Sequence, residues 1–434
     1  MKRGFFTIMS AQFFSSLADN ALFVAAVQLL ISSGAPDWQS AALVPMFALF
    51  YVLLAPFVGA FADALPKGRV MLISNAIKIV GCLMMLFGAH PLMAYAIVGL
   101  GAAAYSPAKY GILTELLPAS QLVKANGWIE GLTIASIILG VLLGGQLVGP
   151  LLSQPLLSID IPWIDTGIHT PAQAAIATLI AVYVVAAWFN LRIPLTGVEM
   201  RPLRHDSSCS VLGNALALLP DFWTCNCRLW SDKLGQISLS TTTLFWGAGG
   251  NLKFIVLAWA GVALGYNTTQ ASALTGVVAI GTAAGAILAS MRMRLDIATR
   301  VIPLGIAMGV LLVLMVFINS IWVAVPFLIV LGGLGGYLVV PMNALLQHRG
   351  HNLMGAGRSI AVQNFNEQAC ILGLGAFYSL SLKLGLSVFG AITVFGVVVA
   401  GIMLVIQRWH ASNCRNHSEE LDHLLHIARQ DTHH

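Results

Sequence analysis

Four charged side chains lie deep inside long apolar stretches of this 434-residue chain: Asp19, Glu130, Lys253 and Glu367. A carboxylate or an ammonium in hydrocarbon costs about 3 kcal/mol even on lenient scales. Such groups therefore usually face a watery cavity, a partner of opposite sign or a polar ligand. The sequence predicts a protein that moves a charged solute.

Membrane-spanning helices must position these charges. The chain is 58% hydrophobic and only 9% charged, whereas about 25% of the residues of a soluble domain are charged. About 20 apolar residues span a bilayer as a helix, and polar loops divide the sequence into about twelve such stretches. We therefore predict an all-α polytopic membrane protein. The predicted spans are 5–31, 42–62, 70–88, 92–113, 127–149, 171–191, 236–263, 268–290, 300–318, 321–346, 357–382 and 385–407.

The positively charged residues predict the orientation of these helices. Most of the 22 Lys and Arg residues fall in or beside one set of alternate loops, and Lys383 is the exception on the other side. Loops rich in Lys and Arg stay in the cytoplasm. Both termini and the connection 193–235 are therefore predicted to be cytoplasmic. The net charge of +5 follows from this topology and does not indicate a nucleic-acid partner.

Neither a metal site nor a cofactor site is expected. Cys225 and Cys227 lack a second pair of ligands nearby, so free thiols are predicted. The glycines of 332–336 superficially suggest a phosphate loop, but they lie inside an apolar stretch, and the sequence contains no Walker lysine-serine motif. Close helix packing at these glycines is the better interpretation, and ATP-driven transport is excluded.

The two halves of the chain share residues at a constant spacing, which indicates an internal repeat. The pairs 234 residues apart are Asp19 and Lys253, Gly99 and Gly333, Gly101 and Gly335, and Pro107 and Pro341. Glu130 and Glu367 follow at 237 residues. Six helices per half keep the repeats parallel, with a substrate site expected near the midplane between them. The predicted domains are an N-terminal six-helix bundle over 1–192, a cytoplasmic linker over 193–235, a C-terminal six-helix bundle over 236–409 and a polar cytoplasmic tail over 410–434.

The loop after the second predicted helix resembles the gate-loop signature of the major facilitator superfamily. The matching residues are Gly59, Asp63, Lys67, Gly68 and Arg69. In that family the aspartate meets a helix N-terminus across the domain interface, and the basic residues tether the loop. The resemblance implies the same conformational role here.

Further segments resemble one family within that superfamily, the bacterial lysophospholipid transporters. These segments are 18–23, 101–113, 122–127, 244–249, 340–347 and 361–364. The similarity runs from the first predicted helix to about the twelfth, and the tail from about His410 falls outside it. The resemblance implies a flippase in the bacterial cytoplasmic (inner) membrane, with no enzymatic activity. It would carry lysophosphatidylethanolamine and related lysolipids from the outer to the inner leaflet by alternating access. An acyltransferase at the cytoplasmic face is the implied functional partner.

The charged residues suit such a cargo. An ethanolamine ammonium needs a carboxylate, and a phosphate needs a cation such as a lysine. Lysine stands at 253 where relatives are expected to carry arginine, and the two do not contact phosphate equivalently. In a separate interpretation, Asp19, Lys109, Lys253 and Glu367 form ion pairs that seal one end of the cavity. The candidate residues for substrate binding or charge gating are Asp19, Asn20, Lys78, Lys109, Glu130, Lys253, Asn364 and Glu367.

Two other functions stay open at this point. A cation-coupled exporter of amphipathic small molecules or drugs has the same fold, with Asp19 and Glu367 as proton sites. The spacing of His417 and Asp422 matches the H-x-x-x-x-D motif of glycerolipid acyltransferases. Too few residues follow for a catalytic domain, so we interpret that match as chance.

Overall fold

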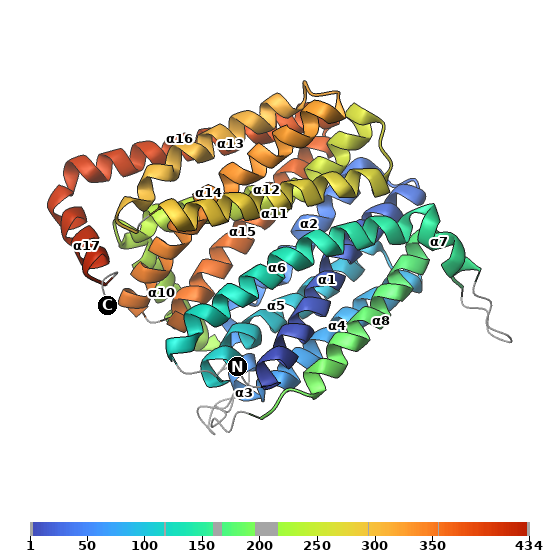
Figure 1. Cartoon of the computed structure of the whole chain (residues 1–434), viewed down its shortest axis with the longest axis horizontal. Helices are drawn as coiled ribbons and strands as arrows, with labels where there is room; N and C mark the ends of the chain where they lie inside the picture. Colours follow the sequence, from blue (N-terminus) through green and yellow to red (C-terminus); the bar gives the residue numbers. More distant parts are fainter. Residues whose placement is uncertain are drawn as a thin grey trace. The chain divides into compact units, whose positions relative to one another are not determined.

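The computed structural model describes residues 3–116, 119–158, 167–195, 216–293, 295–354 and 356–431, and these ranges contain helices and no strand (Figure 1). The N-terminal helices are α1 (Arg3–Ser32), α2 (Asp37–Leu53), α3 (Ala55–Ala64), α4 (Lys67–Leu86), α5 (Pro91–Leu116), α6 (Ala119–Val148), α7 (Pro150–Leu157) and α8 (Pro171–Leu191). The later helices are α10 (Leu218–Ser231), α11 (Gly235–Leu264), α12 (Thr268–Arg292), the 3₁₀ helix η1 (Leu295–Val301), α13 (Ile302–Met315), α14 (Ile321–Met354), α15 (Ala356–Lys383), α16 (Val388–Asn416) and α17 (Ser418–Asp431).

Each of the twelve predicted spans is helical over most of its length, but 42–62 is shared between α2 and α3, and 300–318 between η1 and α13. In the described ranges, nine helices are long and apolar enough to cross a membrane, or ten if the pair bent by 59° at the end of α6 is one span. The predicted span 42–62 is broken, because α2 ends at Leu53 and α3 begins at Ala55. Pro56 stands in the first turn of α3. A proline has no N–H group to continue the preceding helix.

The chain divides into two compact units. The first comprises Met1–Leu218 and Tyr266–Gly276, and the second comprises Leu219–Gly265 and Val277–His434. Of the predicted linker 193–235, residues 196–215 lie outside the described ranges, and α10 occupies much of the remainder. The predicted domain boundaries therefore stay a prediction.

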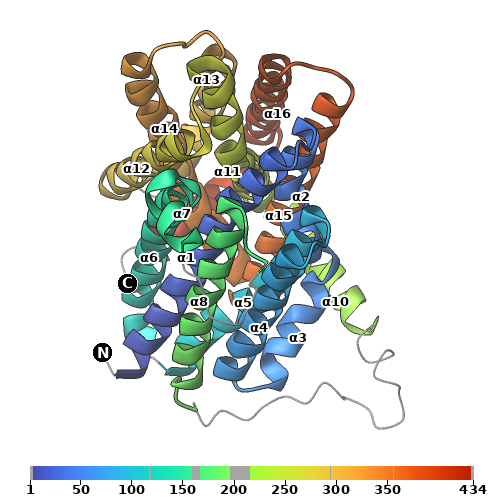
Figure 2. The ribbon, with the colours of Figure 1, turned by 90° about the vertical axis from the view of Figure 1, so that its right-hand side faces the viewer.

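The helices of each unit pack in the same order. In the first unit α1 packs against α6 and α8, while α4 packs against α5 and α8 (Figure 2). In the second unit α11 packs against α15 and α16, while α13 packs against α14 and α16. Helices at matching positions of the two halves thus have matching neighbours, which is the arrangement expected of a parallel repeat.

Close glycine contacts repeat at the same spacing. A Cβ on Gly99 would overlap the carbonyl oxygen of Phe47, and a Cβ on Gly333 would lie 3.6 Å from that of Gly281. Phe47 and Gly281 are again 234 residues apart. A side chain at Gly336 would likewise overlap the carbonyl of Thr282 on α12. The glycines of 332–336 therefore let α14 approach α12 closely, as predicted.

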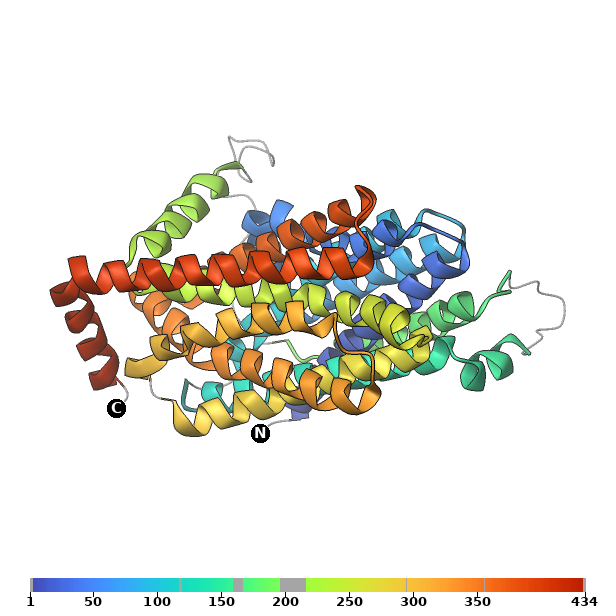
Figure 3. The ribbon, with the colours of Figure 1, turned by 90° about the horizontal axis from the view of Figure 1, so that it is seen from above.

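Helix α10 packs on the second unit through apolar side chains. Cys225 and Leu229 of this helix pack against a core formed with Leu239, Leu346 and Val362 of α11, α14 and α15. Directly after α10, the carboxylate of Asp232 accepts from Nε and Nη2 of Arg349, at 3.1 and 2.5 Å. At the end of the chain, α17 turns back from α16 towards η1 (Figures 1 and 3).

Candidate functional site

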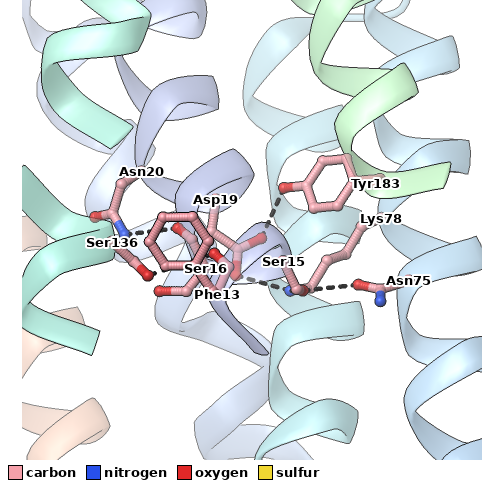
Figure 4. Close-up of polar contacts among 9 residues, drawn as sticks. All are labelled: Phe13, Ser15, Ser16, Asp19, Asn20, Asn75, Lys78, Ser136 and Tyr183. Carbon is pink, nitrogen blue, oxygen red and sulfur yellow. Dashed lines mark hydrogen bonds and ion pairs between the residues drawn. The ribbon is translucent and has the colours of Figure 1, made fainter. Parts of the chain in front are cut away.

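The first unit holds a buried charge cluster built around Asp19 of α1. Nζ of Lys78 on α4 lies 2.7 Å from Oδ2 of Asp19, and the hydroxyl of Tyr183 on α8 donates to Oδ1 at 2.6 Å (Figure 4). The Lys78 side chain is 1% exposed and that of Asp19 is 20% exposed. One carboxylate thus joins three helices, and both of its oxygens are occupied.

Polar and aromatic groups complete the surroundings of Lys78. Its Nζ donates to Oγ of Ser15 at 3.0 Å, and that hydroxyl donates to Oδ1 of Asn75 at 2.8 Å. The ring centroids of Tyr105 and Tyr183 lie 5.1 and 5.6 Å from the ammonium. Aromatic faces attract a cation at this range. The ammonium is therefore held by one full charge, one hydroxyl and two rings.

The local sequence explains how α1 and α4 contribute two groups each. Ser15 and Asp19 are four residues apart on α1, and Asn75 and Lys78 are three apart on α4. Residues at these spacings lie on one face of a helix. On α5, a Cβ at Gly101 would lie 2.7 Å from Cγ of Lys78. Glycine at this position therefore leaves space for the lysine stem.

The pairing of Asp19 with Lys78 was not among the ion pairs that the sequence suggested, although both residues were candidates. Tyr183 was missed. A single tyrosine in an apolar span gives no sequence signal that distinguishes it from a packing residue. Asn20 lies away from Lys78, and its Nδ2 donates to the Ser16 carbonyl of its own helix at 2.9 Å (Figure 4).

The other candidates of the first unit lie outside this cluster or cannot be placed. Lys109 of α5 is 8% exposed, and its Nζ lies 3.4 Å from Oγ1 of Thr133 on α6. The side chain of Glu130 lies outside the described residues. The role assigned to Glu130 therefore stays a prediction.

In the second unit, Glu367 belongs to a polar cluster on α15. The residue is 8% exposed, and its carboxylate accepts from Nε2 of Gln363 at 2.8 Å. The same amide donates to Oδ1 of Asn343 on α14. Asn364 is half-buried on α15, and Lys253 is half-buried on α11. These residues are described within their own unit. The ion pairs predicted among Asp19, Lys109, Lys253 and Glu367 therefore stay a prediction.

The predicted gate loop joins α3 to α4. Nζ of Lys67 donates to the Ala62 carbonyl at 2.7 Å, so this lysine ties the start of α4 to the last turn of α3. A Cβ on Gly68 would lie 3.0 Å from that of Ile193, and Arg69 is exposed. The surroundings of Gly59 and the side chain of Asp63 lie outside what the structure describes. The predicted contact of the aspartate therefore stays a prediction.

Comparisons with known proteins extend this description. Residues 8–373 match the family model of the Major Facilitator Superfamily. The chain is 40% identical over 389 residues to the lysophospholipid transporter LplT of Yersinia enterocolitica serotype O:8 / biotype 1B, covering 89% of each chain. It is 40% identical over 391 residues to the LplT of Yersinia pestis strain Pestoides F, covering 89% of this chain and 88% of the relative.

Two solved structures share the fold at low sequence identity. A bacterial homologue of the human lysosomal transporter Spinster, inward-facing and unoccupied, superposes with a TM-score of 0.67 at 15% identity, covering 96% of this chain and 97% of the other. The nucleoside transporter NupG, in a mutant form, gives a TM-score of 0.65 at 12% identity, covering 94% and 99%. At these identities the likeness concerns the fold alone.

Proposed function

Because the chain belongs to the lysophospholipid transporter family of the Major Facilitator Superfamily, we propose that it carries lysophosphatidylethanolamine and related lysophospholipids from the outer to the inner leaflet of the bacterial cytoplasmic membrane. Membership of this family is the prediction made from the sequence motifs, and it is confirmed. The prediction of a transporter rather than an enzyme is confirmed as well. Alternating access, cytoplasmic termini and reacylation of the delivered lipid by a cytoplasmic-face acyltransferase are parts of the proposal.

The single observation that carries the proposed substrate is the buried pair of Asp19 and Lys78. A phosphoethanolamine headgroup contains one phosphate and one ammonium, the same two charges that this pair contains. When the headgroup binds, its phosphate contacts Lys78 and its ammonium contacts Asp19, so every buried charge keeps a partner of opposite sign. Both contacts are charge-assisted hydrogen bonds, the stronger class.

The same geometry disfavours a lipophilic cation as substrate. Such a cation could approach Asp19 only by competing with Lys78, which is 1% exposed. Displacing the carboxylate would leave a buried ammonium without its counter-charge, and removal of one partner from a buried pair costs about 3–5 kcal/mol. A zwitterion avoids this cost, so the pair favours the lysolipid over the drug-exporter alternative.

The remaining candidates are proposed to act later in the transport cycle. Glu367 and Lys253 lie in the half of the chain that repeats the half containing Asp19. We assign them, with Lys109, Glu130 and Asn364, to headgroup contact or charge gating as the halves alternate. Lys67 and Arg69 are assigned, with Gly59, Asp63 and Gly68, to the loop that favours one gate state.

Uptake of labelled lysophosphatidylethanolamine tests the proposal. Spheroplasts that lack their own transporter would carry this chain as wild type, as Asp19→Asn, or as the control Asp37→Asn, which changes an exposed carboxylate. We expect uptake by the wild type and the control, and at least a tenfold loss in Asp19→Asn because one buried charge has lost its partner. An excess of unlabelled lysolipid should compete, whereas tetraphenylphosphonium should not. Normal uptake by an inserted Asp19→Asn chain would refute the site, and competition by the cation alone would favour the exporter.

A further inference from the structure

A cavity lies in the first unit, beside the start of α4. Its volume is about 240 Å³, and the residues that line it include Lys67, Gly68, Arg69, Asn190, Leu191 and Leu195. Lys78 follows Arg69 by nine residues, about 14 Å along a helix. The cavity is therefore separate from the Asp19 cluster.

One wall of the cavity is the N-terminus of a helix of 20 residues. Pro66 occupies the N-cap position and has no side-chain hydrogen bond to the first turn. The N–H of Arg69 already donates to the Pro66 carbonyl at 2.8 Å, so Lys67 and Gly68 supply the N–H groups that lack partners within the helix, and the helix dipole adds partial positive charge at this end. Arg69 adds a full positive charge that is exposed, whereas Lys67 already donates to the Ala62 carbonyl. This wall suits an anion.

The wall formed by α8 contains an unsatisfied amide. Asn190 is 2% exposed, and neither Nδ2 nor Oδ1 has a hydrogen-bond partner among the described residues. A buried polar group without a partner costs about 1–3 kcal/mol. An acceptor oxygen in the cavity that Asn190 lines would let Nδ2 form its missing hydrogen bond. The amide is thus a second observation, independent of the helix terminus, that points to an oxygen-rich ligand.

Apolar side chains continue from the cavity onto the surface of the first unit. Leu191 and Leu195 line the cavity and are 67% and 75% exposed. One turn away, Trp188 is exposed, and the guanidinium of Arg192 lies 4.4 Å from its ring centroid. Tryptophan and arginine at the end of a membrane helix are typical of the headgroup region of a bilayer. An acyl chain could lie along these leucines while its headgroup enters the cavity.

We propose that this cavity binds the phosphate group of an anionic phospholipid that stays bound while other lipids are transported. Arg69 and the first turn of α4 hold the phosphate oxygens, Nδ2 of Asn190 donates to one of them, and Leu191 and Leu195 contact an acyl chain. The leaflet is the cytoplasmic one if the proposed orientation holds. The binding itself depends neither on that orientation nor on the transported substrate.

Binding can be measured on the purified full chain by native mass spectrometry and by thermal unfolding in detergent. The probes are phosphatidylglycerol, phosphatidylcholine and inorganic phosphate. We expect phosphatidylglycerol to be retained and to raise the unfolding temperature more than phosphatidylcholine does. Arg69→Gln should weaken that binding about tenfold, since a charge-assisted hydrogen bond is lost. The control Arg300→Gln removes an exposed arginine from η1 of the other unit and should change nothing.

A second variant separates binding from folding. Asn190→Leu replaces the unsatisfied amide by an apolar group of similar size, so it should be at least as stable as the wild type without lipid. It should nevertheless lose the stabilisation by phosphatidylglycerol. Equal retention of phosphatidylglycerol by the wild type, Arg69→Gln and Asn190→Leu would overturn the proposal. Protection by inorganic phosphate alone, equal to that by phosphatidylglycerol, would overturn a lipid as the ligand. Each result is read from binding, so it is independent of whether lysolipid uptake succeeds.

Discussion

Removing the two charges of the Asp19–Lys78 pair, singly and together, should separate their roles in stability and in transport. In Asp19→Asn, Lys78 keeps Oγ of Ser15 as an acceptor but loses its counter-charge while 1% exposed. Breaking a buried ion pair in this way costs about 3–5 kcal/mol. Lys78→Met should cost less, because Asp19 is 20% exposed and still accepts from Tyr183. Water can then solvate part of the carboxylate.

The double variant is the informative one. With Asn at 19 and Met at 78 no buried charge remains, and replacing a whole buried pair by neutral groups is often neutral or stabilising. The double variant should therefore recover most of the stability lost by Asp19→Asn, giving a coupling energy of about 2–3 kcal/mol. Lysolipid uptake should not recover, because the proposed exchange of partners needs both charges.

Unfolding of the purified variants in detergent, followed by tryptophan fluorescence against denaturant, measures the stability of each variant and hence the coupling energy. Uptake of labelled lysolipid by spheroplasts with matched membrane levels of each variant measures transport. Additive losses of stability in the double variant would show that the two side chains do not interact as described. Full uptake by the double variant would show that the pair is only structural, and the substrate argument would fail.

Three further variants, one of them with a matched control, test individual contacts. Tyr183→Phe removes the 2.6 Å donor to Asp19; it should cost about 1.5–3 kcal/mol in detergent unfolding and reduce uptake, and unchanged stability would contradict the contact. Gly336→Ala places a Cβ against a carbonyl of α12 and should cost about 1–3 kcal/mol in detergent unfolding. Its control, Gly401→Ala, has open space around the new Cβ and should be neutral in the same measurement. Arg349→Met removes the counter-charge of the buried Asp232 carboxylate, which among the described residues keeps only the Gly235 N–H as a donor, and it should cost about 3–5 kcal/mol. Protease cleavage at α10 should then accelerate, and an unchanged rate would count against a role of this ion pair in holding α10.

The sequence by itself determined which segments become membrane helices and that the chain repeats. Hydropathy is a local property, because each helix must satisfy its own backbone in the bilayer, so the spans could be located without a fold. The 234-residue spacing needed only residue identities, and the contacts of Gly99 and Gly333 with residues at the same spacing agree with the repeat. The family motifs were local strings as well. The charged residues within apolar stretches could also be found from the sequence, because a charge between apolar neighbours is a local feature.

Only the tertiary structure decided which charges meet. Lys78 lies 59 residues from Asp19 and Tyr183 lies 164 residues from it along the chain. The spacing of residues on one helix determines which side chains share a face of that helix, but not which other helix packs against that face. Sequence reasoning suggested ion pairs among Asp19, Lys109, Lys253 and Glu367, and these stay a prediction, whereas the packing of α1 against α4 and α8 adds Lys78 and a tyrosine as partners of Asp19. The unsatisfied amide of Asn190 is likewise invisible in the sequence. Whether a polar side chain finds a hydrogen-bond partner depends on every helix packed around it.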